Sequence, residues 1–94
     1  MIVEFVIKSI VKKQEYPRNK FHAAATGREC DIVSLRVGEI GKLMVDMPYD
    51  PGYPHRFWTT TVLRIETPDD GSIVFETDNS VYTLVKNYGK ESND

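Results

Sequence analysis

The sequence predicts a small all-β barrel. Short segments in which apolar residues alternate with polar ones recur along the chain, and only tight turns separate the last three. Two long connectors separate the earlier segments. We therefore expect five strands in a partly open barrel of the SH3-like or OB-like kind, ending in a three-stranded antiparallel meander. The alternative is a β-sheet with one short helix within residues 18–31.

The first half of the chain contains two of the predicted strands. Residues 2–11 form the first, and their period of two places four apolar side chains on one face: Val3, Phe5, Ile7 and Val11. Residues 12–31 lose the alternation and contain a proline, so they form the first long connector. Residues 42–47 form the second strand, which follows a tight turn or bulge at Gly38 and Gly41.

The last third of the chain contains the meander. Its strands are expected at residues 57–66, 73–77 and 81–86. Their inward side chains are expected to be Phe57, Leu63, Ile65, Ile73, Phe75, Tyr82 and Leu84. In the first turn Gly71 is placed where a positive φ is needed, and the neighbouring Asp69 and Asp70 are typical turn residues.

The chain of 94 residues is long enough for one domain, expected at residues 1–86, with a polar tail at 87–94. Its apolar content of 40% and charged content of 28% are typical of a soluble globular protein. No apolar run approaches the roughly 20 residues of a membrane span. Glu4 and Lys8 interrupt the first apolar run before it resembles a signal peptide. We expect a cytoplasmic protein with no membrane partner.

The charge is distributed unevenly. Residues 1–45 carry eight Lys or Arg against five Asp or Glu, whereas residues 46–94 carry four against nine. The basic excess is concentrated between Lys8 and Arg28, where it could attract an anion. The net charge of −2 falls short of the basic character expected of a dedicated duplex-DNA binder.

Signatures of enzymes and metal sites are absent from the sequence. Cys30 is the only cysteine, which excludes an internal disulfide, and its acidic neighbours Glu29 and Asp31 are expected to raise the pKa of its thiol. The two histidines, His22 and His55, lack the spacing of metal ligands. No phosphate-binding loop, dinucleotide-binding motif or hydrolase motif is present. We expect a protein that is not an enzyme and needs no metal or cofactor.

The segment 46-DMPYDPGYPHRFWTTT-61 is the candidate binding site. Its three prolines restrict the backbone, so it loses little entropy on binding. Phe57 is in phase with the core, so Trp58 should point to the other face. Aromatic rings beside a guanidinium suit a flat anionic ligand. The predicted ligand-binding residues are Tyr49, Tyr53, His55, Arg56 and Trp58 from this segment, with Arg28, Lys20 and His22 from the first connector across a cleft.

Two kinds of function are compatible with these residues. The first is capture of an anionic ligand, either a nucleotide-like small molecule or single-stranded nucleic acid, between the two long connectors. The second is a protein-interaction module or inhibitor that uses the same aromatic segment and the acidic second half. The free edges of a partly open barrel could also pair with a partner or with a second copy. In a purely structural alternative the aromatic rings only cap one end of the barrel.

The runs Thr59-Thr60-Thr61-Val62 and 76-ETDNSVYTL-84 carry a resemblance. The second contains the pattern T-x-N-S-x-Y-x-L, which resembles a hairpin pattern in uncharacterised small proteins of bacteria and their mobile elements. The resemblance covers under a third of the chain. It implies a small accessory or sequestering protein of a mobile element or phage, and it implies no activity and no functional residue.

Overall fold

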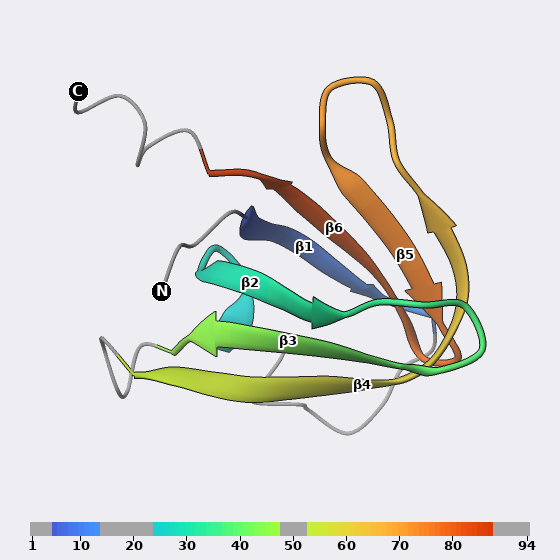
Figure 1. The fold of residues 1–94 in the computed structure, drawn as a ribbon, viewed down its shortest axis with the longest axis horizontal. Coiled ribbons are helices and arrows are strands. Elements are labelled where there is room, and N and C mark those ends of the chain that lie inside the picture. The colour runs from blue at the N-terminus through green and yellow to red at the C-terminus, as the bar shows by residue number, and fades with distance from the viewer. Residues whose placement is uncertain (1–4, 14–23, 48–52, 88–94) are drawn as a thin grey trace.

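The computed structural model describes residues 5–13, 24–47 and 53–87 and shows a closed antiparallel barrel (Figure 1). Its strands follow one another around the barrel in chain order, and the first also pairs with the last. They are β1 (Phe5–Lys12), β2 (Glu29–Ser34), β3 (Ile40–Asp46), β4 (Pro54–Glu66), β5 (Ile73–Thr77) and β6 (Ser80–Lys86).

The prediction of a small all-β barrel with a C-terminal antiparallel meander is confirmed, but the barrel has six strands and is closed rather than partly open. The missed strand is β2. Its alternation is hard to read because Glu29 and Asp31 flank the buried Cys30, so charged residues hide the inward position. In the described part of the barrel each strand has a neighbour on both sides, so the free edges expected for strand addition are not present as such.

The segment expected to hold a short helix is described from residue 24 onward. Ala24 and Ala25 are helical, and Ala25 is fully buried. The chain then turns through Gly27 and enters β2. Hydrogen bonds from the Gly27 amide to the Ile7 carbonyl and from the Ile7 amide to the Arg28 carbonyl hold this turn against β1. No helix among the described residues has the length and apolar character to cross a membrane.

The strand β4 connects the two halves of the barrel. It is 13 residues long, and its first part pairs with β3 while its second part pairs with β5 (Figure 1). The register shifts twice where β4 passes from one partner to the other. One shift lies opposite the step from Ile40 to Lys42 in β3, and the other lies between Val62 and Arg64 in β4. Such bulges bend a strand and increase its twist, which closure of a small barrel requires.

Bulges reverse two predicted side-chain orientations, one in β1 and one in β4. A register shift between Ile7 and Ser9 moves Val11 to the surface, where it is 59% exposed, and Ile10 packs against the core. In β4 the shifts bury Val62 and leave Leu63 48% exposed. A strict period of two therefore fails at both positions, because each bulge inserts one extra residue into the alternation.

Aromatic rings from the meander form the centre of the core. Phe75 stacks on Tyr82 with centroids 4.7 Å apart and planes 10° apart, and Phe57 meets Tyr82 edge-on at 6.1 Å. All three are buried, as predicted. Burial raises the pKa of Tyr82 to about 12. Leu84 and Leu43 are fully buried in the same core.

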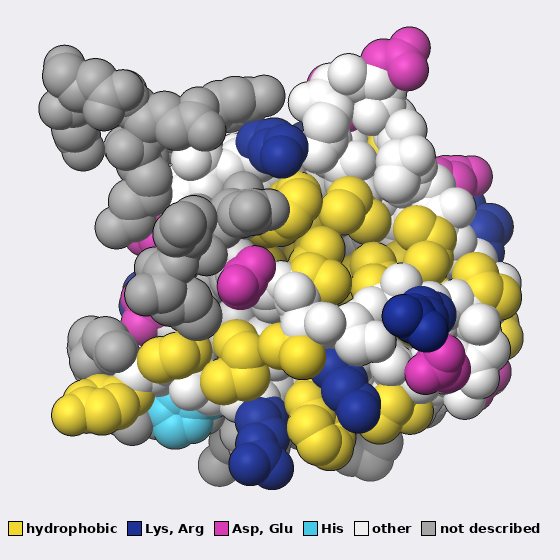
Figure 2. All heavy atoms as spheres, viewed as in Figure 1, with side chains coloured by type: hydrophobic (Ala, Val, Ile, Leu, Met, Phe, Trp, Pro, Cys, Tyr) yellow, Lys and Arg dark blue, Asp and Glu magenta, His cyan; other side chains and the backbone are white. Residues whose placement is uncertain are grey.

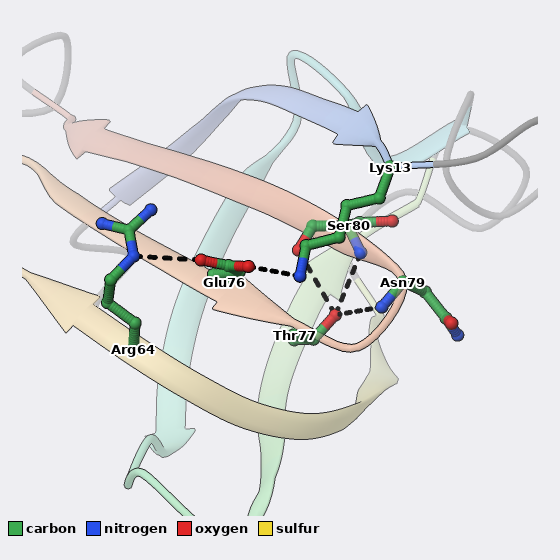
Figure 3. A network of polar contacts seen from close by, with 6 residues as sticks. All are labelled: Lys13, Arg64, Glu76, Thr77, Asn79 and Ser80. Atoms are coloured by element: carbon green, nitrogen blue, oxygen red, sulfur yellow. Dashed lines mark hydrogen bonds and ion pairs between the residues drawn. The ribbon is translucent and has the colours of Figure 1, made fainter.

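Polar side chains fix the β5–β6 hairpin and the end of β1 (Figure 3). The Thr77 hydroxyl accepts hydrogen bonds from the amides of Asn79 and Ser80, each at 3.2 Å. On the outer surface Glu76 forms ion pairs with Lys13 and with Arg64. Both cations hold the pKa of Glu76 below its usual value, and Lys13 has the larger effect. The T-x-N-S pattern thus supplies the hydrogen bonds that hold the turn of this hairpin.

Gly41 allows β3 and β4 to approach closely at the bulge. A Cβ at this position would lie 2.8 Å from Thr59 Oγ1, the atom that accepts a hydrogen bond from the Gly41 amide at 3.0 Å. The turn glycine Gly71 plays a different role, since it has the positive φ of 84° that the sequence predicts.

We predict that Gly41→Ala destabilises the fold by about 1–3 kcal/mol, because the added methyl group overlaps the Thr59 hydroxyl. Denaturant unfolding measures the change. The matched control introduces the same substitution into a Thr59→Ala background, where the overlapping atom is gone and the cost should be smaller. An equal cost in both backgrounds would contradict this explanation.

Candidate functional site

The outward side chains of β3 and β4 form the candidate site. In the antiparallel register Lys42 lies opposite Trp58, and Met44 lies opposite Arg56. Their inward neighbours Leu43 and Phe57 are buried, so these four side chains share the outer surface. We call the set Lys42, Met44, Arg56 and Trp58 the β3–β4 face. Figure 2 shows basic and hydrophobic side chains gathered along this edge of the molecule.

Trp58 is the centre of the β3–β4 face. Its side chain is 51% exposed, although tryptophan is a residue that folding usually buries. The Lys42 Nζ lies 4.9 Å from the ring centroid, and the Arg56 Cζ lies 5.5 Å from it. Both are within the range of cation–π attraction, so two positive charges lie over one half-exposed aromatic ring.

Two acidic residues border this face: Asp46 at the end of β3, and Asp31 on β2. Asp31 is opposite Met44 in the register, and its Oδ1 accepts a hydrogen bond from the Ile32 amide at 2.9 Å. The charges of Lys42 and Arg56 therefore lie around Trp58, and the negative charges lie on β2 and at the end of β3.

Arg28 lies near the start of β4, and its charge is already compensated by Asp46. Its Nε donates to the Asp46 carbonyl at 2.7 Å, and its Nη2 lies 3.2 Å from Asp46 Oδ2. Asp46 is opposite Pro54, where β4 begins. The structure therefore brings Arg28 close to the start of the candidate segment and gives it a structural partner there.

The candidate segment is mostly strand rather than connector. β4 begins at Pro54, so His55, Arg56 and Trp58 belong to a strand that is paired with β3. Among them, His55 is half-buried and lies opposite the buried Val45, on the inward-facing set of positions. His55 is thus separated from the β3–β4 face. Tyr53 precedes the strand and is 68% exposed.

The other predicted site residues lie outside the described residues. These are Tyr49, Lys20 and His22. The cleft expected between the two long connectors falls on the same segments, so it stays a prediction. The part of the site that the structure describes is an open strand face.

Sequence reasoning missed Lys42 and Met44. Both were assigned only to a strand, because cross-strand partners depend on the register and not on distance along the chain. The alternation of the strand could have identified them, because Leu43 points into the core and its neighbours Lys42 and Met44 therefore point outward. Pairing that strand with the next one would have placed the lysine beside an exposed aromatic ring.

The remaining reactive group is structural. Cys30 is fully buried, and burial, with a smaller contribution from Asp31, raises the pKa of its thiol to about 12. The pKa of the thiol is raised, as the sequence predicts, but burial contributes more than the charged neighbours. In the described ranges no three His, Cys, Asp or Glu side chains are grouped so that they could hold a metal ion.

Comparison of the chain with protein-family models, with curated proteins and with solved structures finds no match.

We predict that Cys30 does not react with a thiol reagent in the folded protein at pH 8, because a pKa of about 12 leaves almost no thiolate and the sulfur is fully covered. Colorimetric titration with an aromatic disulfide measures the reaction. In denaturant the same thiol should react within minutes, which is the control. Rapid labelling of the folded protein would contradict the buried position.

Proposed function

We propose that this protein binds an anionic ligand that carries a flat aromatic ring, a nucleotide or single-stranded nucleic acid, on the β3–β4 face. The observation that carries the proposal is the half-exposed ring of Trp58 with two cations over it. Base stacking on such a ring contributes about 1–3 kcal/mol per base. Lys42 and Arg56 supply the positive charge that a phosphate needs.

The position of Trp58 on a strand supports this proposal. The adjacent Phe57 is buried and packs edge-on against Tyr82, so the backbone beneath Trp58 is fixed by the core. Cross-strand pairing with Lys42 fixes it on the other side. A ring that is already in place loses little conformational entropy when a base stacks on it.

The four residues of the face supply stacking and charge, and the proposed role is binding without catalysis. Met44 adds an adaptable apolar surface next to Arg56. The sequence resembles small proteins of mobile elements, and a sequestering role would fit a binding protein of this size.

A second candidate is a protein-interaction module. Tryptophan, methionine and arginine are enriched in protein interfaces, and the face contains all three. The acidic half of the chain offers this alternative less support, because Glu66 and Glu76 both form ion pairs with Arg64. Part of the negative charge that a basic partner would meet is thus already compensated.

Fluorescence of Trp58 tests the proposal directly, because it is the only tryptophan in the chain. We expect nucleotides or short single-stranded oligonucleotides to quench it, with an affinity that falls as salt is added. Arg56→Ala should weaken binding by about tenfold, the effect of losing one charged contact. Its melting temperature should stay near that of the parent protein, because Arg56 is exposed.

The matched control is Lys8→Ala. It removes one exposed positive charge from β1, a strand that pairs with neither β3 nor β4. It should leave the affinity unchanged. Equal affinities of the parent protein and Arg56→Ala, with both folded, would overturn the assignment of this face. A flat fluorescence response across all nucleotides and oligonucleotides would favour the protein-interaction module.

A further inference from the structure

We infer that the ligand of the β3–β4 face is a single-stranded nucleic acid several nucleotides long, which runs along β4 from Trp58 to Tyr53. This inference rests on the proposed function and narrows it, because it excludes a mononucleotide as the complete ligand. It also assigns Tyr53 as a second stacking ring.

The first argument is the spacing of the two exposed rings. Tyr53 immediately precedes β4, and at about 3.3 Å per strand residue the four steps from Pro54 to Trp58 alone span about 13 Å. Stacked nucleotides of one strand repeat every 3.4 Å or so along a duplex axis. A single nucleotide therefore cannot reach both rings, whereas an oligonucleotide can.

The second argument is that both rings are open. Tyr53 lies in a bend just before β4, outside the alternation that turns Phe57 inward and Trp58 outward, and it is 68% exposed. Trp58 is 51% exposed.

The third argument is the placement of charge between and beside the rings. Arg56 lies between Tyr53 and Trp58 in the sequence, and Lys42 lies beside Trp58. Across Met44, the carboxylate of Asp31 makes β2 unfavourable for a phosphate backbone, whereas Asp46, which lies opposite Pro54 on the path, is paired with Arg28. The favourable direction for an anionic strand is therefore along β4, past one ring, a cation and the next ring.

The same charges set the expected salt dependence. Two cations, Lys42 and Arg56, face the track, whereas Arg28 is already paired with Asp46. Each neutralised phosphate of a single strand contributes a slope of about −0.7 to log affinity against log salt, so two give about −1.4. Arg56→Gln should reduce the slope to about −0.7.

The experiment is a length series. Thymidine monophosphate and oligothymidylates of two, four, six and eight nucleotides are titrated into the full-length protein, with Trp58 quenching as the readout. Fluorescein-labelled hexanucleotide anisotropy reports on the variants. An oligouridylate series run beside it shows whether the strand is DNA or RNA, because the preferred sugar gives the higher affinity.

The decisive variant is Tyr53→Ala. It should weaken the hexanucleotide by about 5-fold to 100-fold, the loss of one stacked base, and leave the monophosphate unchanged. Leu63→Ala is the matched control, because Leu63 is an exposed apolar residue five positions beyond Trp58 on the same strand. The Leu63→Ala variant should bind the hexanucleotide with the affinity of the parent protein.

The outcomes separate this inference from the function on which it rests. Affinity that rises up to about six nucleotides and depends on Tyr53 supports the track. Equal affinity for the monophosphate and the hexanucleotide, still lost in Arg56→Ala, overturns the track and leaves the binding site in place. Competition by polyphosphate as strong as by the hexanucleotide overturns stacking on both rings. Quenching by none of these ligands overturns both proposals.

Discussion

The register between β3 and β4 is the constraint on which this surface depends. Leu43 and Phe57 lie opposite each other and are both buried, so the core holds the two strands in one alignment. A slip of one residue in β4 would turn Phe57 outward and drive Trp58 and Arg56 inward, at the cost of burying a charge. With the alignment fixed, Lys42 must face Trp58. The composition of the candidate face is thus a consequence of core packing.

The bulges limit how far this face extends. At Gly41 the close approach of Thr59 ends the regular pairing just beyond Lys42 and Trp58, and the next residues of β4 turn toward β5. The same bulge lets β4 pair with β3 along its first part and with β5 along its second part. Closure through the β1–β6 pairing then leaves the β3–β4 face as an outer surface of a rigid sheet. Sites on strands are held more firmly than sites on connectors.

The proposed binding would rely on stacking with modest electrostatic support. Two cations contact the ring of Trp58, and a third, Arg28, is held by Asp46. Neither Lys42 nor Arg56 has an acidic partner among the ion pairs of the described residues. With so few charges, affinity for a nucleic acid would depend on the rings, and stacking accepts every base. Sequence preference would therefore be weak.

The sequence by itself determined the all-β class, the C-terminal meander with its Gly71 turn, and the opposite orientations of Phe57 and Trp58. These features follow from local alternation and turn chemistry, which a chain carries in neighbouring residues. It did not reveal β2, whose charged residues hide its pattern, or the outward positions of Val11 and Leu63, because bulges form between strands. Only the tertiary structure placed Lys42 beside Trp58, paired Arg28 with Asp46 and separated His55 from Arg56, because cross-strand register is set by packing of the whole core.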